Sequence, residues 1–204
     1  MTEVLKKSER TLSAIVNTAL ELAVTQGLSS MSLGEVAKRL GISKSGVFVR
    51  TGSVENLQDL VLARYEQLFA EHVFLPALEA PRGLPRLDRI MELWVGRGVG
   101  RKAMAGSLHA VAAFDLHPME TLLRKKVRGG VARWRRTLGR TVTQAVEEGH
   151  LKPDTDPAQV AYEISSLMLG YFHDLHFLRD RKVVERTWQA YQRLMSTYKT
   201  PGLS

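Results

Sequence analysis

Apolar residues recur along the chain at spacings of three and four, a period that predicts amphipathic α-helices. The first apolar stripe consists of Leu12, Ile15, Val16, Ala19, Leu22 and Ala23. A shorter second stripe consists of Leu33, Val36, Ala37 and Leu40. No segment shows the sustained alternation of apolar and polar residues that marks a half-buried strand. The pattern therefore predicts an all-α fold of about nine helices.

Capping signals predict where the first helices begin and end. Ser32 and Glu35 stand three residues apart, which is the spacing of a capping box. Gly41 closes the second stripe, since glycine favours the left-handed conformation at a helix C-terminus. Ser43 and Ser53 are each placed to cap a further helix through the side-chain hydroxyl. The N-terminal region thus predicts several short helices in close succession.

The remaining apolar stripes predict longer helices that are separated by prolines and glycines. Pro76, Pro81 and Pro85 interrupt the pattern, and Asp156 followed by Pro157 is typical of a capped helix start. The glycine-rich stretch 96–106 follows no predicted strand and lacks dinucleotide-loop spacing, so we interpret it as a helix break. The longer predicted helices cover about 53–69, 87–95, 123–142, 157–178 and 181–198.

A short, polar helix is predicted within the stretch GISKSGVFVRTGSVENL, at residues 44–50. It follows the helix at 33–40 after a tight turn at Gly41 and Ile42, which is the pattern of a helix-turn-helix. The second helix of that motif enters the DNA major groove with its N-terminal residues leading. Helix pairs of this kind also occur in bundles that bind no DNA, so the pattern alone leaves both readings open.

The residue types in this short helix suit DNA contact. Lys44 and Arg50 are expected to neutralise phosphates, and the helix N-terminus itself favours an anion. Ser45, Gly46 and Val47 are expected to approach base edges, although Val47 is equally suited to point back into the small domain. Loss of a phosphate contact would weaken binding to all sequences alike, whereas loss of Ser45 would relax preference at one position.

The stretch from Ala14 to Leu57, AIVNTALELAVTQGLSSMSLGEVAKRLGISKSGVFVRTGSVENL, resembles the N-terminal domain of TetR-type transcriptional regulators. A looser similarity extends through EEGHLKPDTDPAQVAYEISSLMLGY near the C-terminus. The resemblance implies a homodimeric repressor that binds a palindromic operator and releases it when a small ligand binds. It implies a DNA-binding domain over 1–52 and a ligand-binding and dimerisation domain over 53–204. The expected DNA-binding residues are Ser32, Ser43, Lys44, Ser45, Gly46, Val47, Phe48, Arg50 and Ser53.

The chain departs from the usual TetR-type pattern at four positions. Many members have tyrosine where Phe48 stands, so one hydroxyl contact to phosphate is missing. Position 50 is often histidine, whereas Arg50 adds a permanent charge. An aromatic core residue is usual at Thr51, and a lysine at Val54. These departures bear on affinity and backbone contacts.

The C-terminal region holds polar and aromatic residues within otherwise apolar helices. Such residues could orient an apolar or aromatic ligand in a cavity, and they could equally be ordinary core side chains. His173 and His176 share a helix face, but no further residues with metal-ligand spacing accompany them, so no metal and no cofactor is predicted. The expected ligand-binding residues are Tyr65, Trp94, His109, Phe114, Tyr171 and His173. The expected dimer-interface residues, on helices 157–178 and 181–198, are Tyr162, Leu169, Trp188, Tyr191 and Met195.

Composition narrows the function classes further. The 204 residues carry a net charge of +8, with +10 concentrated in residues 82–140, which suggests polyanionic partners. Eight basic residues between Arg124 and Arg140 share a helix with an apolar stripe, so we interpret them as a solvated face. The absence of cysteine, of a signal peptide and of an apolar run of about eighteen residues predicts a cytoplasmic protein without a membrane partner.

Two alternatives to a DNA-binding regulator remain at this level. One is an interaction protein with the same fold and weak or lost operator binding, which is suggested by the departures from the TetR-type pattern at Phe48, Thr51 and Val54. The other is an enzyme using His109, Asp115 or the histidines at 173–176 as acid and base. No nucleophile pattern, metal set or phosphate-binding loop supports the enzyme, so no catalytic residue is predicted.

Overall fold

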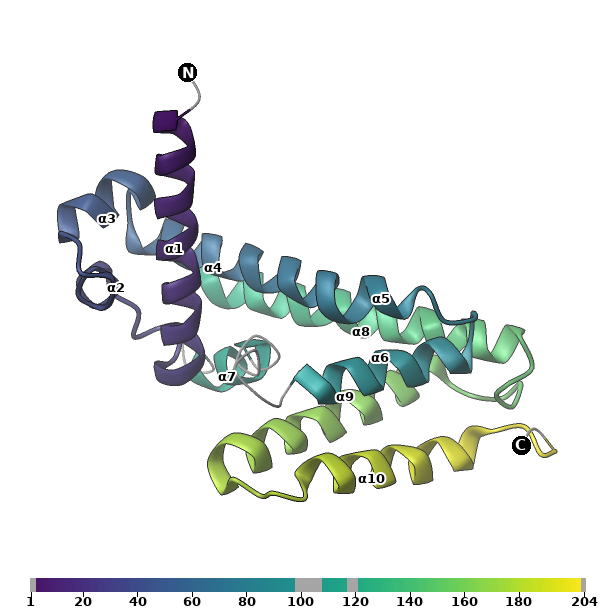
Figure 1. Ribbon diagram of the computed structural model, residues 1–204. Helices are drawn as coiled ribbons and strands as arrows, with labels where there is room; N and C mark the ends of the chain where they lie inside the picture. The colour runs from purple at the N-terminus through teal and green to yellow at the C-terminus, as the bar shows by residue number, and fades with distance from the viewer. Residues whose placement is uncertain (1–2, 98–107, 117–120, 203–204) are drawn as a thin grey trace. The chain divides into compact units, whose positions relative to one another are not determined.

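A computed structural model of the chain describes residues 3–97, 108–116 and 121–202 (Figure 1). The described residues are overwhelmingly helical and contain no β-strand, only one isolated bridge between Leu151 and Lys199. The predicted all-α class is therefore confirmed. The glycine-rich stretch predicted as a helix break lies mostly outside the described residues. The helices are α1 (Glu3–Gln26), α2 (Leu33–Leu40), α3 (Lys44–Thr51), α4 (Val54–Phe69), α5 (Leu75–Ala77), α6 (Leu84–Arg97), α7 (Leu108–Asp115), α8 (Leu122–Glu147), α9 (Pro157–His173) and α10 (Val183–Tyr198).

The chain forms two compact units. The first unit comprises residues 1–68 and 107–128, and the second comprises residues 69–106 and 129–204. Helix α4 ends at this division and α8 crosses it, so the units do not follow the predicted boundary between residues 52 and 53. That boundary remains a prediction about where DNA binding ends.

Helices α1, α2 and α3 form one end of the first unit, where α2 and α3 pack against each other and against α1 (Figure 1). The predicted caps are confirmed. The Ser32 hydroxyl accepts a hydrogen bond from the Glu35 backbone N–H at 3.1 Å. Gly41 ends α2 in the left-handed conformation at φ 65°, which only glycine adopts without strain. These local signals set the tight turn between α2 and α3.

The second unit is built on α6, α9, α10 and the larger part of α8, with α9 and α10 side by side (Figure 1). The Asp156 carboxylate caps α9 by accepting from the Ala158 N–H at 2.8 Å, and Pro157 is the first helical residue, as predicted. The Gln159 side-chain amide donates to the Glu163 carboxylate one turn later at 2.9 Å. The core of the unit is formed by fully buried apolar side chains, including Leu87, Ile90, Met91, Leu138, Val142 and Ile164.

Two π-helical segments interrupt the regular helices of the second unit. Ala70–Phe74 continues α4 into α5, and Asp174–Leu178 extends α9. The apolar period predicted both helices but not the widened turns. Of the prolines expected to break the pattern, Pro76 lies in α5 and Pro85 in the first turn of α6. Proline is tolerated there because the N–H groups of a first turn have no intrahelical partner.

Candidate functional site

The outer face of α3 is polar at its start and apolar further along. Lys44 and Ser45 are exposed in the first turn. Phe48 is 54% exposed and Val49 is 80% exposed, one turn further on. The Ser43 hydroxyl caps the helix by accepting from the Gly46 N–H at 3.0 Å. This face presents a cation, a hydroxyl and two apolar side chains.

Val47 does not lie on this face. Its side chain is fully buried, so the expectation that it approaches a base edge is wrong, and the alternative that it points into the small domain holds. Thr51 is also buried, and its hydroxyl donates to the Val47 carbonyl at 3.1 Å. Because this hydrogen bond lies within the helix, Thr51 can replace the usual aromatic residue without leaving a buried polar group unpaired. Val47 and Thr51 therefore anchor α3.

Arg50 folds back along α3 instead of extending from it. Its Nη1 donates to the Gly46 carbonyl at 2.8 Å, and its Nε is buried without a partner among the described residues. A guanidinium has five donors, so part of the group stays available for phosphate. Ser53 caps α4 by accepting from the Asn56 N–H at 3.0 Å. The hydroxyls of Ser32, Ser43 and Ser53 thus serve the helix starts.

A carboxylate ties the α1–α2 turn to α7. Asp115, the last residue of α7, accepts from the Ser29 N–H at 2.7 Å and from the Ser29 hydroxyl at 2.5 Å. Gly27 has φ 93°, and a Cβ at that position would lie 3.0 Å from the Asp115 carboxylate. The turn that precedes the helix-turn-helix is therefore held by α7. Asp115 therefore has a structural partner in Ser29.

Tyr65 and His109 meet inside the first unit. Their rings pack edge to face with centroids 4.6 Å apart, and Tyr65 is buried. The His109 Nε2 lies 4.0 Å from the Glu66 carboxylate. Phe114, by contrast, is 74% exposed, which does not fit the expected role of lining a ligand cavity.

An aromatic cluster lies inside the second unit. Phe69 packs edge to face with Trp94 at 5.6 Å and with Trp134 at 4.6 Å between ring centroids. Trp94 and Trp134 pack edge to face at 5.3 Å, and Phe74 reaches Trp134 at 6.5 Å. Trp94 is one of the predicted ligand residues, whereas Trp134 is not. The sequence signal for Trp134 is its position between Arg133 and Arg135 on a basic helix.

Tyr171 and His173 were also predicted to contact a ligand. Tyr171 is buried and donates its hydroxyl to the Val95 carbonyl at 2.6 Å, and burial raises the pKa of Tyr171 to about 12. His173 is more than half exposed and pairs with the neighbouring Asp174 carboxylate at 2.9 Å. Tyr171 thus joins α9 to α6, while the exposure of His173 does not fit a cavity lining.

Replacing Tyr171 with Phe is expected to lower the free energy of unfolding by about 1–2 kcal/mol. The change keeps the ring but removes the hydroxyl that donates to the Val95 carbonyl, and the loss of a buried hydrogen bond costs about that much. Urea denaturation followed by circular dichroism measures the difference. Tyr162→Phe is the matched control, because Tyr162 is 53% exposed and its change should stay within about 0.5 kcal/mol.

The predicted dimer residues divide into exposed and buried groups. Tyr162 and Leu169 are exposed on α9, and Trp188 is half-buried on α10. Tyr191 and Met195 are each only 1% exposed within one chain, so their assignment to an interface is wrong. The Tyr191 hydroxyl donates to the Asp88 carboxylate at 2.7 Å. The Tyr191 pKa is raised well above its usual value, mainly by burial and also by this carboxylate.

The surface between α9 and α10 forms an open groove whose lining includes the small residues Ser166, Gly170 and Ala190. Tyr162, Ser166, Leu169 and His173 follow one another at spacings of four, three and four on α9, and each is at least partly exposed. Small residues at helical spacing allow another helix to approach closely.

The basic residues of α8 fit the predicted solvated face only in part. Lys126 pairs with Asp59 at 2.6 Å in the first unit, and the Arg135 guanidinium lies 5.6 Å from the Tyr162 ring centroid in the second.

Among the described residues, no three His, Asp or Glu side chains gather as a metal site would require. Within the same residues, no helix has the length and apolar character needed to cross a membrane.

The arrangement of α1, α2 and α3, with a capped and outward-facing α3, is that of a helix-turn-helix transcriptional regulator joined to a helical second unit. Residues 83–191 match the family model described as tetracyclin repressor-like, C-terminal domain. The match covers more than half of the chain, and the chain belongs to the TetR family of transcriptional regulators. No curated protein matches the sequence.

Solved structures with the same fold are distant in sequence. A TetR transcriptional regulator from Chloroflexus aurantiacus superposes with a TM-score of 0.85 at 16% identity, over 96% of this chain and 100% of that one. A TetR-family regulator from Agrobacterium tumefaciens gives 0.82 at 14% identity, over 95% and 100%. A protein from Saccharomonospora viridis, solved in complex with choline, gives 0.77 at 17% identity, over 94% and 99%.

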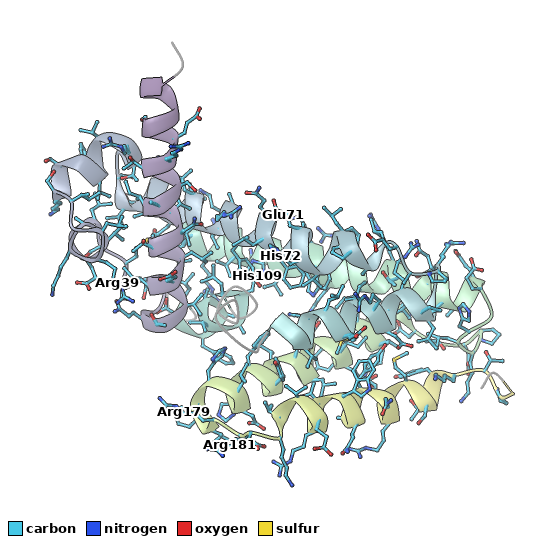
Figure 2. The ribbon with its side chains drawn as sticks, viewed as in Figure 1. Arg39, Glu71, His72, His109, Arg179 and Arg181 are labelled. Carbon is cyan, nitrogen blue, oxygen red and sulfur yellow. The ribbon has the colours of Figure 1, made fainter. Side chains whose placement is uncertain are left out.

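Three features of the site were not predicted from the sequence. Val49 is the most exposed apolar residue of α3, and its place two residues after Val47 indicated the opposite face. Arg39 is an exposed cation of α2 and projects outward from it in Figure 2. Asp115 gave no local signal, because its partner Ser29 is 86 residues away in the sequence.

Proposed function

We propose that this TetR-family protein is a ligand-responsive transcriptional repressor that binds a palindromic DNA operator as a homodimer. The observation that carries the proposal is the outer face of α3, where exposed polar and apolar side chains surround a helix that Val47 anchors from behind. A helix that packed only against protein would bury Phe48 and Val49. A major groove offers both hydrogen-bonding base edges and thymine methyl groups to such a face.

In the proposed complex, each side chain of α3 has a distinct role. Lys44, at the helix start, neutralises a phosphate, and Ser45 donates to or accepts from a base edge. Phe48 and Val49 make apolar contacts with thymine methyl groups. Arg50 exchanges part of its contact with the Gly46 carbonyl for a phosphate oxygen. Exposed Arg39 adds a further cation from α2.

Homodimerisation supplies the second reading helix. One short helix covers too few base pairs for useful specificity, and a two-fold dimer places two half-sites about 34–36 Å apart or a multiple of one turn. The open groove between α9 and α10 supports their use as the dimer face, with Tyr162 and Leu169 as apolar contacts. The complex of a related fold with choline supports a small-molecule role for the second unit. The ligand must prefer the state that does not bind DNA.

A salt titration of operator binding tests the DNA contacts. An operator is first selected from a random duplex library, and a scrambled duplex is the comparison. Lys44→Ala is expected to weaken binding to both duplexes by tenfold or more, and to reduce the slope of log affinity against log salt by about one unit per subunit. Ser45→Ala is expected to keep the slope and relax preference at one position of each half-site. Binding should saturate at two chains per operator.

The control is Lys152→Ala, which removes a partly exposed cation whose ammonium donates to the Thr197 carbonyl in the second unit. Its DNA affinity and salt slope should match those of the parent protein. If Lys44→Ala and Ser45→Ala both leave binding unchanged, α3 is not the reading helix. The rival role, an interaction protein without operator binding, would be supported by failure to select any duplex.

A further inference from the structure

The aromatic cluster of the second unit contains two hydrogen-bond donors without partners. The indole Nε1 atoms of Trp94 and Trp134 are both inaccessible to solvent, and neither has an acceptor among the described residues. Trp94 as a whole is only 7% exposed. A buried donor without a partner costs about 1–3 kcal/mol, so native proteins rarely keep two side by side without a reason.

The geometry of the rings restricts which chemistry the cluster can offer. The interplanar angles between Phe69, Trp94 and Trp134 lie between 79° and 87°, so the rings pack edges against faces. A cage for a quaternary ammonium ion needs several ring faces turned to one shared space. Here the three rings pack edge to face against one another, and the polar groups left unsatisfied are the two indole N–H groups.

The backbone beside the cluster is irregular at the same place. Phe69 is the last residue of α4, and Phe74 ends the π-helical segment Ala70–Phe74. Both phenylalanines contact Trp134. A single widened turn inside a helix is destabilising by itself and is found frequently at functional sites. Four helical segments thus converge on two unpaired donors beside a local distortion.

We propose that Trp94 and Trp134 recognise a neutral, planar, largely apolar ligand through a hydrogen-bond acceptor such as a carbonyl oxygen. The indole N–H groups donate to the acceptor, and the surrounding rings supply apolar contact area. This inference rests on the proposed function, in which the second unit binds a small ligand, and it assigns that ligand a chemical class. A charged ammonium group would meet two donors and no acceptor at these atoms.

The test uses two probes of the same shape that differ only in the acceptor. The probes are 2-acetylnaphthalene, which carries a carbonyl, and 2-ethylnaphthalene, which carries a methylene in its place. Binding to the full-length, nitrogen-15-labelled protein is followed through the three indole N–H resonances of Trp94, Trp134 and Trp188, assigned by single Trp→Phe variants. No DNA is present in this measurement.

The ketone is expected to bind about tenfold more tightly than the ethyl compound, the equivalent of one hydrogen bond. It should move the Trp94 and Trp134 resonances downfield and leave Trp188 in place. Trp94→Phe keeps an aromatic side chain but removes the indole N–H, so it should reduce the preference for the ketone by a larger factor than it reduces affinity for the ethyl compound. Trp188→Phe is the matched control and should retain the tenfold preference.

Equal affinity for the two probes in the parent protein would overturn the inference without the use of any variant. Tighter binding of trimethyl(naphthylmethyl)ammonium than of the ketone would assign the cluster to a cation instead, and binding of none would show a closed core. The proposed function is tested separately by adding the ketone to the operator complex. If the ketone binds through Trp94 but leaves operator affinity unchanged, ligand response fails and the site stands. If operator affinity responds to compounds that bind equally well to Trp94→Phe, the site fails and ligand response stands.

Discussion

Gly83→Ala is expected to lower the free energy of unfolding by about 3 kcal/mol. Gly83 has φ 92°, where an L-residue with a Cβ is strained by about 1–2 kcal/mol. The new Cβ would also lie 2.5 Å from Nδ1 of His150 and 3.2 Å from the Ala145 Cα. His150 would have to move, although its Nδ1 accepts from the Leu84 N–H at the start of α6. Urea denaturation measures the loss.

Gly96→Ala is the control for this prediction. Gly96 lies in the last turn of α6, the helix that begins directly after Gly83, and a Cβ there would meet nothing within 4 Å. Alanine is favoured over glycine within helices by about 1 kcal/mol, so this change should be neutral or slightly stabilising. Equal destabilisation by the two substitutions would contradict the role assigned to the contact between Gly83 and His150.

Val47→Ala is expected to destabilise the protein by about 2 kcal/mol, whereas Val49→Ala should leave stability unchanged. The two valines are two residues apart on α3, but Val47 is fully buried and Val49 is 80% exposed. Removal of two buried methyl groups loses their transfer free energy and leaves a cavity. Thermal or urea denaturation of the two variants measures the difference directly.

The same pair separates anchoring from DNA contact. Val47→Ala should weaken operator binding because α3 becomes less firmly placed, with no change in the salt slope, since Val47 lies near no phosphate. Val49→Ala should instead alter preference for thymine within each half-site. Two results would show that Val47 lies at the DNA surface. One is that the Val47→Ala variant is as stable as the parent protein, and the other is that the folded variant prefers different bases.

The fold of the N-terminal helices could be predicted from sequence because their determinants are local. Ser32, Ser43 and Gly41 act on backbone groups within five residues of themselves, and the hydroxyl caps and the left-handed glycine appear as predicted. Burial within α3 was less certain, because eight residues contain too few turns for a periodic signal. Val47 therefore received two incompatible roles, of which the structure keeps one.

Contacts distant in sequence could not be predicted in this way. The apolar period of α10 contains Trp188, Tyr191 and Met195, but it does not state whether the partner is α6 or a second chain. The contact between Tyr191 and Asp88 joins residues 103 positions apart, and it assigns Tyr191 to the core. Two of the predicted ligand residues, Phe114 and His173, are exposed for the same reason, since they lie on helices whose covered faces depend on the tertiary packing.

The π-helical segment Ala70–Phe74 has a consequence for comparing this chain with others. One additional residue in a helical turn rotates all following positions by about 100° relative to an uninterrupted α-helix. A relative whose corresponding helix is regular should therefore be one residue shorter within this segment. An ungapped alignment would match buried positions such as Val73 and Ala77 to surface positions of that relative, and their substitution patterns would look contradictory. A single gap placed inside residues 70–74 restores the correspondence of inward-facing side chains on both sides.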